Sequence, residues 1–188
     1  MLKIAAIFVF VAACPVPIYA AANFLFTPQY QEAGNQFHLT GVGAKNILFF
    51  KIFTAGLYLG EGISAAQVLN DVPKKLEVVY SQAIPATRLA RETRQRMRMN
   101  VGEKEYQRLK LRIDVMDKYY MNIKPGDHYA LTYIPKIGTR FIYNCKLIGV
   151  IDGADFAKGL FAVWFGEKPI DNHLKADLLG LGEPKLDD

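Results

Sequence analysis

The stretch that most constrains the fold is residues 39–60, which read LTGVGAKNILFFKIFTAGLYLG. Residues 47–59 carry a single charge, Lys51, and are rich in β-branched and aromatic side chains. This composition favours a strand over a helix, and the scarcity of polar side chains indicates a strand that is covered on both faces. The sequence therefore predicts one long central strand, which follows a glycine turn at Gly41 and Gly43.

Lys45 is the one cation between that turn and the apolar run. A covered strand with a lysine at its start fits the wall of a small-molecule cleft, with Lys45 at the mouth. It also fits a plain core strand, which is the commoner case in globular domains. From the residues alone, both interpretations stay open.

Residues 1–22 have the pattern of an export signal and are left out of the fold. Lys3 forms a short positive region, residues 4–13 are apolar and uncharged, and three alanines at residues 20–22 suit cleavage directly after them. A second interpretation is a lipobox that ends in Cys14, which would become a lipidated N-terminus. We therefore expect an exported, periplasmic protein, with a lipoprotein anchored through Cys14 as the alternative.

The remaining chain suits one domain over residues 23–180, followed by a loose tail at residues 181–188. About half of the sequence is hydrophobic, which is enough for a sizeable core. The formal net charge of +5 is modest and does not by itself indicate nucleic-acid binding.

The order of predicted elements indicates an α+β fold in which an antiparallel sheet carries helices on one side. The evidence is alternating hydrophobicity in the strand candidates and three- and four-residue spacing in the helix candidates. After the central strand we expect a short helix in residues 61–71, a strand at 75–80, helices at 85–100 and 103–120, strands at 128–133, 139–145 and 147–151, and helices at 156–165 and 171–179.

The helix expected at residues 85–100 carries a stripe of arginines. The simplest interpretation is a solvated helix face. The functional alternatives are gating of an anionic ligand, peripheral contact with anionic lipid, or a nucleic-acid patch, and the lack of interleaved aromatic side chains argues against the last. The stripe consists of Arg88, Arg91, Arg94 and Arg98.

The sequence offers no familiar catalytic or metal-binding motif. His38, His128 and His173 lie far apart and lack the spacing of metal ligands. No nucleophile elbow, phosphate loop or dinucleotide fingerprint appears, and no pair of carboxylates is an evident acid–base couple. We therefore predict no metal, no cofactor and no catalytic residue from the residues themselves.

Four stretches carry a family resemblance, in the order LTGVGAKNI…KIFTAGLYLG, GDHYALTYIPKIGTRFIYN, IDGADFAKGLFAVWFGEKPI and LKADLLG. Together they cover residues 37–180 and resemble the chalcone isomerase-fold family, in particular its bacterial chalcone isomerase-like group. The resemblance implies an open-faced β-sandwich, in which helices are layered on one face of a large antiparallel sheet above a ligand cleft.

The resemblance also implies a site. In the plant isomerases, an arginine after the glycine turn and a threonine on the next strand help to close a chalcone to a flavanone. In the fatty-acid-binding branch, the arginine and a tyrosine hold a carboxylate. Here Lys45 falls at the arginine position and Phe53 at the threonine or tyrosine position. Lysine keeps the charge without the planar fork of arginine, and phenylalanine lacks the hydroxyl.

These departures predict a non-catalytic protein that binds a small amphipathic ligand, such as a fatty acid, with Lys45 as the anion contact. The alternatives left open are an isomerase (an intramolecular lyase) with another substrate, a haem-binding protein and a protein-interaction module. In a single strand, residues 45, 47, 49 and 53 would share one face. The expected ligand-binding residues are Lys45, Phe53, Thr54, Ile47 and Phe49.

Overall fold

The structure is a computed structural model that describes residues 26–182. Seven strands form one antiparallel sheet in which each strand pairs with the next along the chain. The predicted export signal lies outside the described residues, as does most of the predicted tail. The strands are β1 (Gln29–Glu32), β2 (Asn35–Ile47), β3 (Phe50–Gly60), β4 (Lys74–Tyr80), β5 (His128–Ile134), β6 (Gly138–Tyr143) and β7 (Lys146–Ile151).

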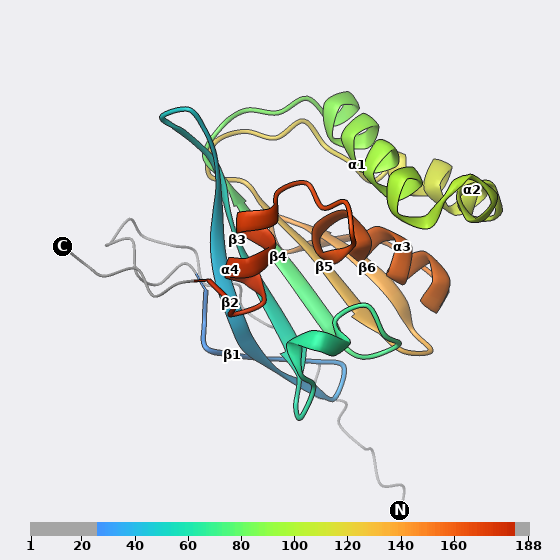
Figure 1. Cartoon of the computed structure of the whole chain (residues 1–188), viewed down its shortest axis with the longest axis horizontal. Coiled ribbons are helices and arrows are strands. Elements are labelled where there is room, and N and C mark those ends of the chain that lie inside the picture. The colour runs from blue at the N-terminus through green and yellow to red at the C-terminus, as the bar shows by residue number, and fades with distance from the viewer. Residues whose placement is uncertain (1–25, 183–188) are drawn as a thin grey trace, which may run out of the picture.

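Four α-helices lie together on one face of this sheet (Figure 1). Their apolar side chains and the inward-facing side chains of the strands form one continuous hydrophobic core. This arrangement confirms the predicted α+β open-faced sandwich. The helices are α1 (Ala86–Val101), α2 (Glu103–Asp117), α3 (Ala154–Phe165) and α4 (Asn172–Leu178). None of the described helices is both long enough and apolar enough to cross a lipid bilayer.

The prediction of one long central strand is wrong, because residues 39–60 fold into a β-hairpin. β2 ends at Ile47, β3 begins at Phe50, and these two residues are paired across the hairpin. Leu48 and Phe49 form the two-residue turn, in which Leu48 has a φ of 54°. Such turns usually carry asparagine or glycine. The sequence therefore shows no turn residue where the chain reverses.

Gly41 and Gly43 lie within β2 and not in a turn. A Cβ atom at Gly41 would lie 2.2 Å from the backbone oxygen of Asp177, and one at Gly43 would lie 2.8 Å from a side-chain carbon of Leu174. Both contacts belong to the α4 segment. The two glycines are therefore needed for the close packing of α4 on β2, and this packing brings α4 to the end of the strand that carries Lys45.

The remaining elements agree with the predictions, except that the short helix at residues 61–71 is a single 3₁₀ turn, η1 (Ala65–Gln67). On the face of the sheet away from the helices, a second cluster packs around Phe26 and Tyr58. On the same side, Glu32 of β1 forms an ion pair with Arg140 of β6. The sheet therefore has one helix-covered face and one face covered only by the N-terminal part of the described chain.

Candidate functional site

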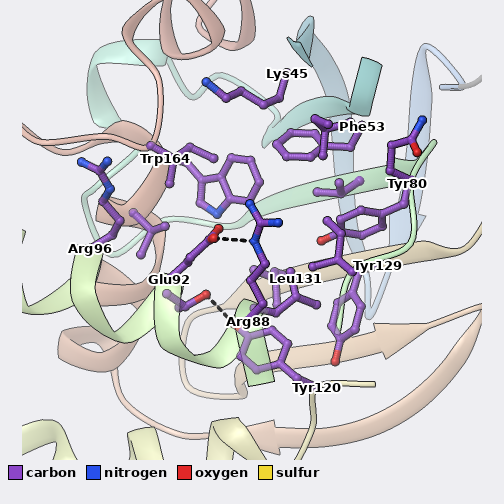
Figure 2. Close-up of a pocket in the computed structure, with 18 of the residues that line it drawn as sticks. Lys45, Phe53, Tyr80, Arg88, Glu92, Arg96, Tyr120, Tyr129, Leu131 and Trp164 are labelled. Atoms are coloured by element: carbon purple, nitrogen blue, oxygen red, sulfur yellow. Dashed lines mark hydrogen bonds and ion pairs between the residues drawn. The ribbon is translucent and has the colours of Figure 1, made fainter. Parts of the chain in front are cut away.

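A cavity of about 450 Å³ lies between the sheet and helices α1 and α3 (Figure 2). This volume falls within the range of about 300–1,000 Å³ that is typical of small-molecule sites. The cavity is bounded by β2 to β5 on the sheet side and by α1, α3 and the segment before α4 on the other. It lies where the family resemblance placed a ligand cleft.

The inner wall of the cavity is apolar and aromatic. The alternation of side chains along β3 and β4 directs Phe53, Val78 and Tyr80 toward the helices. The ring of Phe53 meets those of Tyr80 and Trp164 in edge-to-face geometry, with centroid distances of 5.8 Å and 5.6 Å. The other apolar lining residues include Leu89, Leu131, Leu160, Val163 and Ile170. This wall suits a hydrocarbon or an aromatic ring.

Three tyrosines add hydroxyl groups to the wall. Burial raises the pKa of Tyr120 to about 12 and raises the pKa values of Tyr80 and Tyr129 further, so all three hydroxyls are protonated at neutral pH. The Tyr120 hydroxyl donates to Thr93 Oγ1 at 3.1 Å. The Tyr80 hydroxyl makes no hydrogen bond within the described residues and is directed into the cavity (Figure 2). It is a hydrogen-bond donor that a ligand can use.

Three cationic side chains line the cavity. Lys45 Nζ lies 2.5 Å from Asp171 Oδ2. Arg88 Nε lies 2.8 Å from Glu92 Oε1 on the same helix. Arg96, which is partly exposed, makes no ion pair with any of the described residues. Arg96 is therefore the cation in this wall that is not already matched by a carboxylate.

Asp171 is fixed by two contacts. As the N-cap of α4, its carboxylate accepts a hydrogen bond from the backbone N–H of Leu174 at 3.0 Å, and it also accepts one from Lys45. Desolvation raises the pKa of Asp171, but these hydrogen bonds outweigh it and leave the pKa below its usual value. The carboxylate is therefore charged at neutral pH and occupies the ammonium group of Lys45.

Of the five predicted binding residues, three line the cavity and two do not. Lys45, Ile47 and Phe53 line the cavity. Phe49 does not, because it lies at the hairpin turn and is 99% exposed. Thr54 does not either, because it lies opposite Val79 in the register and so faces the side of the sheet away from the helices. The placement of Phe49 follows from the hairpin, and that of Thr54 follows from the alternation of side chains along β3, which puts it on the face opposite Phe53.

The predicted arginine stripe is mostly paired within the protein. Arg88 pairs with Glu92 and Arg98 with Glu103 on exposed surfaces, and Arg94 pairs with Asp117. Two arginines of α1 line the cavity: Arg88, which belongs to the predicted stripe, and Arg96, which does not. Sequence reasoning also missed Tyr80 and Trp164, because only the tertiary packing shows that a strand and a helix leave a space between them.

None of the three histidines lines the cavity. His128 lies 3.9 Å from Glu77, which is not a cavity residue. Within residues 26–182, no group of three or more histidine, cysteine or acidic side chains is arranged to hold a metal ion. A haem in this cavity would therefore lack a histidine ligand from the wall.

Comparison with known proteins identifies a family and solved structures with a similar fold. A family profile described as chalcone isomerase-like matches residues 20–180. The crystal structure of the Arabidopsis thaliana fatty-acid binding protein AtFAP1 superposes with a TM-score of 0.61 at 14% sequence identity, covering 82% of this chain and 90% of AtFAP1. No curated protein matches the sequence. At this identity, the structural likeness establishes the fold.

Proposed function

Because this chain belongs to the chalcone isomerase-like family, we propose that it binds one small amphipathic anion, such as a fatty acid, without transforming it. The observation that carries the proposal is the cavity of about 450 Å³, which has an apolar wall and cationic residues. The fatty-acid binding named for AtFAP1 makes a fatty acid the first ligand to test.

The hydrocarbon tail would lie against the apolar wall formed by Phe53, Leu131 and Val163. Each buried methylene contributes about 0.8 kcal/mol, so affinity should rise with chain length until the cavity is full. The ordering of the ligand offsets part of this gain. Chain length is therefore the first property by which the site would select its ligand.

The carboxylate would lie between Arg96 of α1 and Lys45 of β2. Arg96 offers a planar pair of N–H donors that suits a carboxylate, and no described carboxylate is paired with it. Lys45 would share its charge between the ligand and Asp171. We expect Arg96 to supply the larger part of the anion contact.

Trp164 is the only tryptophan in the sequence, and it lines the cavity. Its fluorescence therefore reports directly on ligand entry. Titration of delipidated protein with decanoate should give a saturable change at one ligand per chain. Decanol, which has the same tail and no charge, should bind more weakly.

Two neighbouring valines provide a matched pair of variants. Val78 lines the cavity, whereas Val79 packs on the opposite face of the same strand. Val78→Phe should fill the cavity and abolish the fluorescence change, and Val79→Phe should leave it intact. Equal titrations for the two variants, or no response from the wild type, would overturn the proposal. Conversion of a chalcone by the wild type, lost in Val78→Phe, would favour the isomerase alternative.

The export signal in residues 1–22 belongs to the same proposal and would place the cavity in the periplasm. Cell fractionation should find the protein in the periplasmic extract when it is expressed with residues 1–22, and in the cytoplasm when it is expressed without them. Recovery with the membrane pellet, lost in Cys14→Ser, would instead support the lipoprotein alternative.

A further inference from the structure

The turn between β2 and β3 presents four successive apolar side chains to solvent. Ile47 is 46% exposed, Leu48 85%, Phe49 99% and Phe50 64%. We call these four residues the hairpin tip. Figure 1 shows the tip, in teal, projecting beyond the sheet and away from the helices. A contiguous apolar group of this kind marks an interaction surface in a soluble domain.

The residues of the tip are unfavourable for the turn that they form. Leu48 adopts a φ of 54°, a left-handed conformation that favours glycine or asparagine. Leucine and phenylalanine at this turn disfavour it locally and expose apolar surface, and they contribute nothing to the described core. Neither hairpin stability nor solubility accounts for them.

Lysines flank the tip along the same end of the sheet. Lys51 follows the tip directly on β3. Lys124 belongs to the turn before β5, in which the N–H of Gly126 donates to the carbonyl of Tyr80 at the end of β4. Lys146 is the first residue of β7 and follows the turn between β6 and β7. None of these three lysines forms an ion pair with the described residues.

Of the carboxylates toward this end of the sheet, Asp171 and Glu92 are already paired with Lys45 and Arg88. Asp127 accepts hydrogen bonds from the hydroxyl of Tyr143 at 2.6 Å and from the side chain of Asn144 at 2.9 Å. Its oxygens are thus occupied by neutral donors, and the three lysines outnumber it. The tip is therefore an apolar wedge on an edge with net positive charge.

We propose that the hairpin tip docks on the surface of an anionic lipid bilayer. Leu48, Phe49 and Phe50 enter the boundary between headgroups and acyl chains, and the lysines contact the lipid phosphates. A narrow convex wedge of four successive apolar residues suits the soft surface of a bilayer. Protein interfaces are flatter and carry their apolar residues inside a polar rim.

The hairpin also connects this surface to the cavity. Ile47, which belongs to the tip, and Ile52, which lies two residues after it, line the cavity from the two strands of the hairpin. A docked tip therefore holds the cavity close to the lipid surface, where an amphipathic ligand is taken up or delivered. This role in ligand uptake or delivery rests on the proposed function, whereas the docking itself does not.

The test is co-sedimentation of the mature protein with vesicles of phosphatidylcholine alone and with vesicles that contain about one-quarter phosphatidylglycerol. The wild type should pellet with the anionic vesicles and much less with the neutral ones, and added salt should weaken binding. The variant Leu48→Asn with Phe49→Gly should lose at least about tenfold in partitioning. Asparagine followed by glycine favours this turn, so the thermal midpoint of the variant should not fall.

The same double variant separates docking from ligand binding, because neither residue lines the cavity. It should retain the Trp164 response to decanoate in the absence of vesicles. The docking proposal is overturned if the wild type stays in the supernatant, if the double variant pellets equally well, or if neutral and anionic vesicles bind equally. It is also overturned if sedimentation shows a dimer that the double variant dissociates and no vesicle binding is seen.

Discussion

Lys45 Nζ lies 2.5 Å from Asp171 Oδ2, and this ion pair joins the second strand to the N-terminus of the last helix. The cation that the family resemblance identifies as the anion contact is therefore held by a carboxylate of the same chain. A ligand carboxylate must share Lys45 with Asp171 or displace it. The predicted effects of substitution at the two positions consequently have opposite signs.

Asp171→Asn should strengthen binding of decanoate about two- to fivefold, because it releases Lys45 from a competing charge. Asparagine also caps helices well, so the backbone N–H of Leu174 keeps its partner. In the Asp171→Asn background, Lys45→Met should weaken decanoate binding. This second substitution leaves no carboxylate unpaired, because the partner of Lys45 is already an uncharged amide. Trp164 fluorescence titrations check both effects, and equal affinities for all three proteins would exclude Lys45 as an anion contact.

Arg96→Ala should weaken decanoate binding by roughly tenfold, because a charge-assisted hydrogen bond contributes about 1.5–3 kcal/mol before ordering costs. Arg91→Ala is the matched control, since Arg91 lies on the same helix, is exposed and does not line the cavity. The affinity of Arg91→Ala for decanoate should stay within about twofold of that of the wild type. The same loss in both variants would show a long-range effect of charge in place of a contact.

Gly41→Ala should destabilise the protein by about 1–3 kcal/mol, because the added Cβ atom would overlap the backbone of α4. The helix must move, and the contact between Asp171 and Lys45 moves with it. Val42→Ala, which truncates a neighbouring and partly exposed side chain of β2, should cost less. Urea unfolding measures both changes, and a smaller effect for Gly41→Ala than for Val42→Ala would contradict the close packing of α4.

Lys74 should make stability depend on pH. It is fully buried, and its Nζ donates to the carbonyl of Asn70 at 2.5 Å. Burial lowers the pKa of Lys74 from 10.5 to about 8, and nearby Asp71 opposes this shift only in part. Between these two pKa values the unfolded chain holds the proton more tightly than the folded one, so stability rises with pH across this window.

The free energy of unfolding should increase by on the order of 2 kcal/mol between about pH 7 and about pH 9.5, and Lys74→Met should remove this increase. Buried tyrosines act in the opposite sense above about pH 10. Their pKa values are raised in the folded state, so the unfolded chain loses the hydroxyl protons first and stability falls as the pH rises. Urea unfolding of both proteins across the lower window is the measurement. Parallel pH profiles would show that Lys74 is not the titrating group.

Most of the secondary structure could be read from the sequence, because local patterns determine it. Alternation predicts the strand that contains Val78, and four-residue spacing predicts the two central helices. The hairpin at Leu48 escaped this reasoning, since its turn lacks asparagine and glycine. Gly41 was wrongly assigned to a turn, because glycine is typical of turns. Its role is to allow α4 to pack closely on β2.

The site was only partly predictable. Lys45 and Phe53 were found through the family resemblance, and both line the cavity. Asp171 could not be found, because it meets Lys45 across 126 positions of the chain. Arg96 could not be separated from its neighbours on α1, because the side of the helix that faces the cavity is set by how the helix packs on α3 and the sheet.

The most direct test of ligand binding in the cavity is native mass spectrometry of the delipidated mature protein mixed with decanoate. A complex with one ligand should form with the wild type and with Val79→Phe, and it should be absent with Val78→Phe. This pattern would place the ligand between the sheet and helices α1 and α3. Absence of a complex with the wild type, or an equal complex with Val78→Phe, would contradict the account.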